Sequence, residues 1–116
     1  MKTIIYFGDQ LPKTADSTST LSIETERIDK GYCFICSILN IVDKTTANKL
    51  LELGIKNGEQ YAPIVKRKAG TNDYSLVANT KGIICKAGEQ LYGKVYLPTS
   101  GDKCFLVFSG ELMKEE

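Results

Sequence analysis

The chain has 116 residues and a formal net charge of +1, with 42% hydrophobic and 25% charged residues. This length and composition are typical of one globular domain, so residues 1–116 are expected to form a single domain. The near-neutral charge favours neither nucleic acid nor an anionic membrane as a bulk partner. The sequence contains no histidine, which excludes Ser–His and Cys–His catalytic pairs and removes the commonest general base near neutral pH.

No targeting or membrane-spanning segment is evident in the sequence. Residues 1–9 contain a very short apolar run that ends at Asp9, whereas a signal peptide needs about 7–15 apolar residues. No segment approaches the roughly 20 apolar residues of a membrane-spanning helix. We therefore expect the protein to stay in the cytoplasm, or to be assembled there into something larger, with no membrane association.

The first third of the chain is expected to consist of strands and a loop. Residues 1–8 are predicted to form a strand, and residues 9–20, rich in Ser, Thr and Asp, a polar loop. Residues 21–27 begin with alternating apolar and polar side chains, which fits a half-exposed strand. The apolar run from Tyr32 to Val42 is ambiguous, because its spacing also fits a helical face. Its aromatic and β-branched residues favour a buried strand.

One short helix is predicted near residues 43–53. Asp43 or Thr45 could accept a hydrogen bond from an unpaired N–H group of the first turn. The apolar side chains of the segment recur at a spacing that would place them on one buried face. Gly54 follows where a left-handed residue commonly ends a helix.

The second half of the chain is a series of short apolar segments separated by glycine, which predicts short strands joined by tight turns. Pro63 lacks a backbone donor, so residues 61–68 are expected to form an edge strand. Residues 91–97 alternate, with Leu91, Val95 and Leu97 on one side and the intervening tyrosines and lysine on the other. Residues 104–108 are apolar on both faces, which predicts a central strand or one that lies beneath a partner.

These elements predict an α+β fold that is mainly antiparallel β, a small barrel or sandwich with the one short helix. The principal core residues are expected to be apolar side chains distributed over all of the predicted elements. They are Ile4, Tyr6, Ile23, Cys33, Ile35, Leu39, Ile41, Leu50, Val65, Val77, Ile84, Leu91, Val95, Leu106 and Phe108.

The four cysteines, Cys33, Cys36, Cys85 and Cys104, all lie in apolar surroundings. Cys33 and Cys36 form a C-x-x-C pair, which can be a redox dithiol or half of a zinc site. A zinc site would need a second ligand pair, and the two residues point to opposite faces if they lie in a strand. We therefore favour reduced core thiols over metal binding and redox chemistry, and expect no cofactor, no metal site and no catalytic residue.

One basic cluster, Lys66-Arg67-Lys68, and a face formed by Tyr92, Lys94 and Tyr96 are the candidate interaction residues. Tyrosine and lysine on a flat sheet suit a protein partner, and they also suit single-stranded nucleic acid held by base stacking and phosphate contacts. Two simpler interpretations remain open. The basic cluster can be a solvated strand end, and the tyrosine face can be covered by the chain's own predicted helix.

The stretch from Lys81 to Leu97, KGIICKAGEQLYGKVYL, resembles the turn-dense β-sheets of small tailed-phage virion proteins of the capsid-decoration or head-fibre type. This resemblance implies a structural protein without an active site that binds a capsid lattice or copies of itself. We therefore expect a non-enzymatic interaction protein that acts through a sheet surface. The alternative functions are a single-stranded nucleic-acid-binding β-domain and a small enzyme that uses Cys33 and Cys36 or a carboxylate.

Overall fold

The computed structural model of the protein describes residues 3–78 and 82–114, with side chains from residue 8 onward. Within these ranges the chain forms nine strands and no helix. The strands are β1 (Thr3–Thr14), β2 (Leu21–Glu24), β3 (Tyr32–Asp43), β4 (Leu50–Asn57), β5 (Gln60–Lys68), β6 (Ser75–Val77), β7 (Ile83–Cys85), β8 (Glu89–Tyr96) and β9 (Lys103–Lys114). The expectation of a mainly antiparallel β fold is confirmed.

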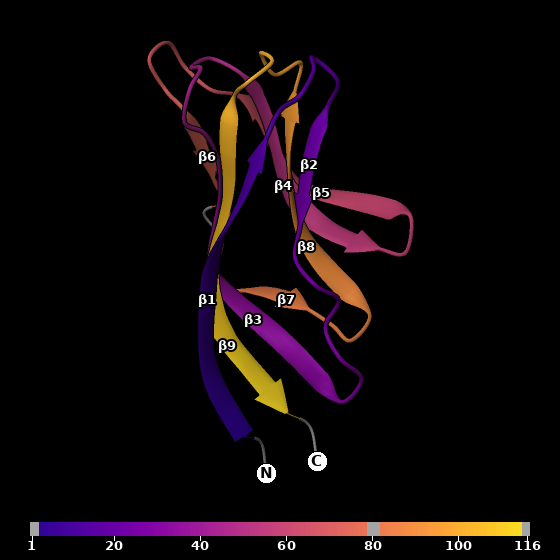
Figure 1. Cartoon of the computed structure of the whole chain (residues 1–116). Helices are drawn as coiled ribbons and strands as arrows, with labels where there is room; N and C mark the ends of the chain where they lie inside the picture. Colours follow the sequence, from indigo (N-terminus) through magenta and orange to yellow (C-terminus); the bar gives the residue numbers. More distant parts are fainter. Residues whose placement is uncertain (1–2, 79–81, 115–116) are drawn as a thin grey trace.

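The strands form two antiparallel sheets that lie one over the other (Figure 1). Sheet A has the order β1-β9-β3-β6, with β7 also paired to β3, and sheet B has the order β2-β8-β4-β5. Apart from the β4–β5 and β6–β7 connections, every link between consecutive strands crosses from one sheet to the other. No pairing between described strands joins the sheets into a closed barrel.

The two sheets differ in length. Strands β1, β3 and β9 have 12 residues each, which corresponds to about 40 Å of extended chain. This length accounts for the 46 Å long axis of the molecule. In sheet B the strands have only 4 to 9 residues. Sheet A therefore extends beyond sheet B at the end where β1 begins and β9 ends (Figure 1).

The core lies between the sheets and consists of inward-facing aliphatic side chains. Leu39, Ile41, Leu51, Leu53 and Leu106 have no exposed surface. The sheets approach closely at Gly93, where an added Cβ would lie 2.8 Å from Cδ1 of Ile41 and 2.9 Å from Cδ1 of Leu106. The removal of these apolar side chains from water is the main force that holds the two sheets together.

The predicted core is confirmed in part. Ile23, Leu39, Ile41, Leu91, Val95, Leu106 and Phe108 are buried, and Val65 packs against them. Cys33 and Ile35 are only half-buried, and the side chains of Ile4 and Tyr6 lie outside the described residues.

Three residues that were expected in the core lie on the outer faces of the sheets. Leu50 is 36% exposed, Val77 48% and Ile84 56%. Each is adjacent in sequence to a buried residue (Leu51, Leu76 or Ile83), and neighbours in a strand point to opposite faces. The pairing register therefore places the neighbours, and not these residues, in the core.

The predicted helix at 43–53 is wrong. Asp43 ends β3, residues 44–49 form an irregular connection with Asn48 at φ 65°, and β4 begins at Leu50. The carboxylate of Asp43 does accept hydrogen bonds from the N–H groups of Thr45 and Thr46, at 3.1 and 3.0 Å, but it does so in a turn. Asp43 therefore caps no helix, and the segment after it is a strand because β4 pairs with strands on both sides.

The predicted loop at 9–20 is also wrong over residues 9–14. These residues continue β1, because all of them pair with β9, from Asp9 opposite Phe108 to Thr14 opposite Lys103. Pro12 is tolerated because β1 is an edge strand.

Other strand predictions hold. Tyr32–Val42 is a strand, the segment containing Pro63 is an edge strand of sheet B, and residues 104–108 lie in a strand with a partner on each side. Leu97 does not continue the apolar face of β8, because it leaves the strand with φ 47° and is 74% exposed.

Candidate interaction surfaces

The outer face of sheet B carries a connected polar cluster centred on Glu52. Tyr92 donates a hydrogen bond to Oε2 of Glu52 at 2.5 Å, and Tyr96 donates one to Oε1 at 2.8 Å. Tyr92 is fully buried although it lies on the outer face, and Glu52 is 4% exposed. The cluster is therefore built into the sheet and is not a free surface.

Gly54 makes room for this arrangement. It pairs with Tyr92 across β4 and β8, and an added Cβ would lie 2.8 Å from the Tyr92 hydroxyl oxygen and 2.3 Å from the backbone oxygen of Ala62. Only glycine leaves this space. Burial and the hydrogen bond to Glu52 raise the pKa of Tyr92, and the same causes raise the pKa of Tyr96 to about 12, so both hydroxyls keep their protons.

A second cluster joins β2, β4 and β5 through Glu24. Its carboxylate accepts hydrogen bonds from Tyr61 at 2.6 Å and from Lys56 at 3.1 and 3.2 Å. Burial alone would raise the pKa of Glu24, but these hydrogen bonds outweigh it and lower the pKa. The Tyr61 ring meets the Tyr92 ring edge to face at 4.8 Å, so the two clusters are continuous.

The predicted interaction residues are only partly brought together. Tyr92, Lys94, Tyr96 and Lys66 share the outer face of sheet B, with Nζ of Lys66 3.9 Å from Oε1 of Glu52 and 4.4 Å from the Tyr96 ring. Nζ of Lys94 lies 3.5 Å from the centroid of the Tyr61 ring. Both lysines thus contact carboxylate or aromatic groups of the same sheet.

Arg67 lies apart from this group, whereas Lys68 shares the outer face with Lys66, two residues farther along β5. Arg67 pairs with the core residue Leu51, so it points to the side of β5 opposite Lys66, and Lys68 pairs with Leu50 at the end of the strand. Both side chains are exposed. The basic cluster of the sequence is therefore divided between two faces of an edge strand.

The outer face of sheet A is apolar and uncharged over much of its length. On β9 it presents Phe105, Val107 and Ser109, flanked by Lys103 and Glu111, and these residues face Val42, Asn40 and Ile38 of β3. Ile38 is 53% exposed, and the misassigned residues Val77 and Ile84 extend the same face over β6 and β7.

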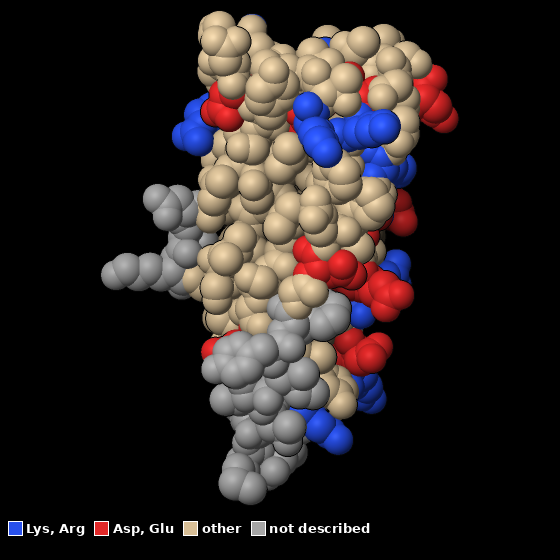
Figure 2. Space-filling view, turned by 60° about the vertical axis from the view of Figure 1, so that its left-hand side comes forward, with Lys and Arg blue, Asp and Glu red and all other residues tan. Residues whose placement is uncertain are grey.

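Figure 2 turns the sheet A side of the molecule forward. It shows a broad area without charged side chains, with blue and red groups at its margins. No described element of the chain covers this face. In the sequence, this area is indicated by residues 104–108, which are apolar on both faces of their strand. We name the area that includes Ile38, Val77, Ile84, Phe105 and Val107 the apolar face.

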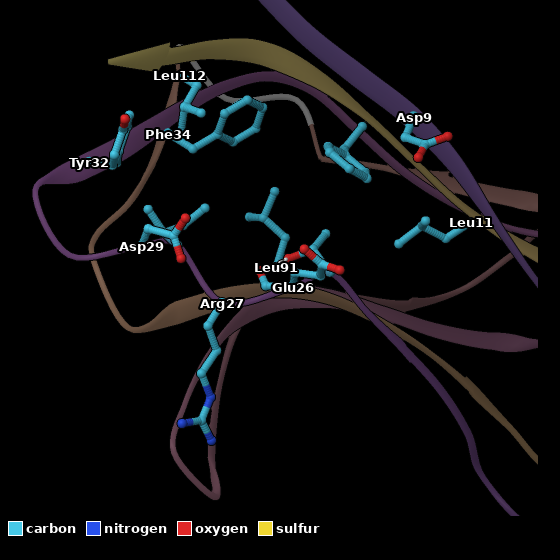
Figure 3. A pocket seen from close by; sticks show the side chains of 12 residues that line it. Asp9, Leu11, Glu26, Arg27, Asp29, Tyr32, Phe34, Leu91 and Leu112 are labelled. Atoms are coloured by element: carbon cyan, nitrogen blue, oxygen red, sulfur yellow. Dashed lines mark hydrogen bonds between the residues drawn. The ribbon is translucent and has the colours of Figure 1, made fainter. Parts of the chain in front are cut away.

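A cavity of about 560 Å³ opens between the overhanging part of sheet A and the connection from β2 to β3 (Figure 3). Its walls are mainly apolar, and Asp9, Glu26 and Asp29 supply carboxylates to its lining. Sequence reasoning missed this site because its residues are dispersed over four strands and a loop.

Asp43 and Asp102 form a buried carboxyl pair where β3 ends and β9 begins, with 0% and 1% exposure. Asp102 accepts hydrogen bonds from the Thr46 hydroxyl at 2.7 Å and from the Thr99 N–H at 2.9 Å, whereas Oδ2 of Asp43 is buried without a partner among the described residues. Burial and the neighbouring Asp102 raise the pKa of Asp43 to about 6. Burial alone would raise the pKa of Asp102 as well, but the hydrogen bond that protonated Asp43 can donate and the one from Thr46 outweigh burial and lower the pKa of Asp102.

The four cysteines are free thiols. Cys36, Cys85 and Cys104 are buried, and burial raises their pKa values to about 11, 12 and 12, whereas Cys33 is half-buried.

Among the described residues no three side chains of His, Cys, Asp or Glu converge as metal ligands. None of the described residues forms a helix long and apolar enough to cross a lipid bilayer.

In comparisons with known proteins, no protein family and no curated protein matches the chain.

Proposed function

We propose that this protein is a non-enzymatic structural protein that associates with a second copy of itself through the apolar face of sheet A. The single observation that carries the proposal is that residues 104–108 of β9 are apolar on both sides of the strand, while only the inner side is covered by the other sheet. An exposed apolar area rimmed by charged residues is characteristic of a protein–protein contact site.

The size of the apolar face fits a weak or moderate dimer. Three long strands over about eight residues, together with the short strands β6 and β7 of three residues each, cover roughly 500 Å² at about 4.8 Å between strands and 3.3 Å per residue. Two such faces in contact would bury about 1,000 Å², which is near the lower limit for a specific interface. The charge pattern also fits, because an uncharged face can meet its own copy across a twofold axis without like-charge repulsion.

The strand order supports a more specific interpretation as a sandwich of the jelly-roll type. When β6 and β7 are taken as two parts of one edge strand, the order of sheets A and B is that of a jelly roll. Jelly rolls occur in viral capsid proteins, lectins and cupins, so the order agrees with an assembly role without selecting it. The resemblance of residues 81–97 to phage virion proteins leads us to propose a capsid-associated component.

The alternative of single-stranded nucleic-acid binding has weaker support. Stacking of bases needs free aromatic faces, but Tyr92 is fully buried and Lys94 covers the ring of Tyr61. Oligonucleotide binding that falls steeply with salt and weakens in a Lys66→Glu variant would favour this alternative.

Light scattering coupled to size exclusion tests the proposed self-association. The wild-type chain should shift from monomer to dimer between about 1 and 100 μM. Ile84→Lys places one charge from each copy in the interface and should keep the chain monomeric. Thr18→Lys, in an exposed loop away from the apolar face, adds the same charge and should leave the dimer intact.

At a protein concentration low enough for both chains to be monomeric, Ile84→Lys should have the same free energy of unfolding in urea as the wild type. The reason is that the side chain of Ile84 is already 56% exposed in the monomer. A wild-type chain that stays monomeric throughout the concentration range would refute self-association. Loss of the dimer in both lysine variants would place the contact elsewhere.

A further inference from the structure

The cavity exists because the two sheets have unequal lengths. Sheet A contributes Leu11 of β1, Phe34 of β3 and Phe108 and Leu112 of β9, whereas sheet B contributes only Leu91 of β8. Asp9 of β1 and Tyr32 of β3 also line the cavity, and the connection between β2 and β3 supplies the remaining residues, with Ile28 as its apolar side chain. The inner face of the overhanging part of sheet A thus has a loop opposite it, and space remains between them (Figure 3).

The walls are suited to an apolar group. The Phe34 and Phe108 rings meet edge to face with centroids 6.0 Å apart, which fixes one wall. A volume of about 560 Å³ lies within the range of small-molecule sites, which is roughly 300–1,000 Å³. The inward-facing polar atoms of Thr25 are already used, since its hydroxyl accepts from the N–H of Leu91 at 3.0 Å and donates to the backbone oxygen of Glu26 at 3.1 Å.

The charged groups of the lining are unbalanced. Asp9, Glu26 and Asp29 contribute carboxylates, and none of them forms an ion pair with a described residue. Asp9 accepts one hydrogen bond, from the neighbouring N–H of Gln10. Arg27 is the one cation among the lining residues, and Figure 3 shows its side chain directed away from the cavity. Negative charge therefore borders an apolar space without a positive partner.

We propose that this cavity binds a small amphipathic cation, an apolar body of aliphatic or aromatic carbon with a terminal ammonium group. The body would displace water from the walls formed by Phe34, Leu91 and Phe108, and the ammonium would lie among the carboxylates of the rim. A neutral ligand would leave the carboxylates unpaired, and an anionic ligand would be repelled by them. A bare metal ion would gain little from the apolar walls.

Binding of three probes with the same eight-carbon chain tests the proposal. Octylammonium, octanol and octanoate each contain eight carbon atoms and carry a positive, neutral and negative polar end, respectively. Their binding can be followed by amide chemical shifts of the 15N-labelled chain. Octylammonium should bind most tightly and octanoate least, with shifts confined to residues near 25–34, 91 and 108. Affinity for octylammonium should fall with added salt, and affinity for octanol should not.

Two variants separate the charge from the cavity. The double variant Glu26→Gln/Asp29→Asn should weaken octylammonium binding by about 2- to 30-fold, since each of the two exposed ion pairs contributes about 0.2–1 kcal/mol. The same variant should leave octanol binding unchanged. Asp16→Asn removes an exposed carboxylate that is not part of the lining and should change neither.

Equal affinity for the three probes, or unchanged octylammonium affinity in the double variant, would overturn the proposal, as would shifts that map away from the cavity. The inference is independent of self-association, because the apolar face and the cavity lie on opposite sides of sheet A. Ile84→Lys should therefore bind octylammonium as the wild type does.

Discussion

The buried carboxyl pair should make the stability of this protein depend on pH, and Asp43→Asn should remove much of that dependence. The variant retains a side-chain oxygen that can accept from the N–H groups of Thr45 and Thr46, as Oδ1 of Asp43 does at 3.1 and 3.0 Å. It replaces the unpartnered Oδ2 with an NH₂ group that can donate to Asp102. It thus imitates the protonated form of Asp43.

The magnitude follows from the pKa of Asp43, which is raised from 3.8 to about 6. Between these values the folded chain binds more protons than the unfolded chain, so this contribution is full below the lower value and is lost as pH rises through the higher one. Each unit of pKa difference corresponds to about 1.4 kcal/mol, so the wild type should lose about 2 kcal/mol between pH 4.5 and pH 7.5. Asp102, whose pKa is lowered, contributes the opposite dependence only at more acidic pH.

Urea unfolding followed by far-UV circular dichroism, under reducing conditions at several pH values, measures this difference. Asp43→Asn should be more stable than the wild type by about 1 kcal/mol near pH 4.5 and by about 3 kcal/mol near pH 7.5, so that the gap widens by about 2 kcal/mol. Asp16→Asn, at an exposed position, should follow the wild-type profile. A parallel pH profile for Asp43→Asn and the wild type would show that Asp43 is ionised in the folded chain and would refute the reasoning.

Three further predictions concern the packing of the sheets. Gly54→Ala should destabilise the fold by about 1–3 kcal/mol because its Cβ would overlap a backbone oxygen, whereas Gly70→Ala, with open space around it, should cost little in the same urea assay. Tyr92→Phe leaves a buried carboxylate oxygen without its donor and should cost about 1–3 kcal/mol. In an alkylation time course Cys33 should react first and the other three thiols only on unfolding; fast reaction of all four in the folded chain would revive a role in thiol chemistry.

The strand predictions succeeded where a single local signal and the final pairing agree. Pro63 indicates an edge position, and β5 is an edge strand. The alternation of residues 91–96 places Leu91 and Val95 in the core and Lys94 on the outer face, as β8 shows. In these segments the residue pattern already contains the information that decides which face is buried.

The predictions failed where pairing partners distant in sequence decide the structure. Nothing between residues 43 and 53 reveals that β4 will lie between β5 and β8, and this pairing converts a helix-like spacing into a strand. The core assignments of Val77 and Ile84 failed for a related reason, because strands of three residues contain too little pattern to fix their register. The cavity could not be predicted from the sequence, because it arises from the unequal lengths of the two sheets.

The different chemistry of the two outer faces limits the kind of assembly that this chain can form. On sheet B the tyrosines, glutamates and lysines mostly satisfy one another, so a partner placed there would have to replace existing contacts. On sheet A the apolar face has no such partners. A single self-complementary face produces a closed dimer, whereas a lattice needs a second, different contact. Measured mass should therefore stop rising at twice the monomer mass as concentration increases. Continued growth beyond the dimer would show that a second surface is also used, as a capsid-bound role would require.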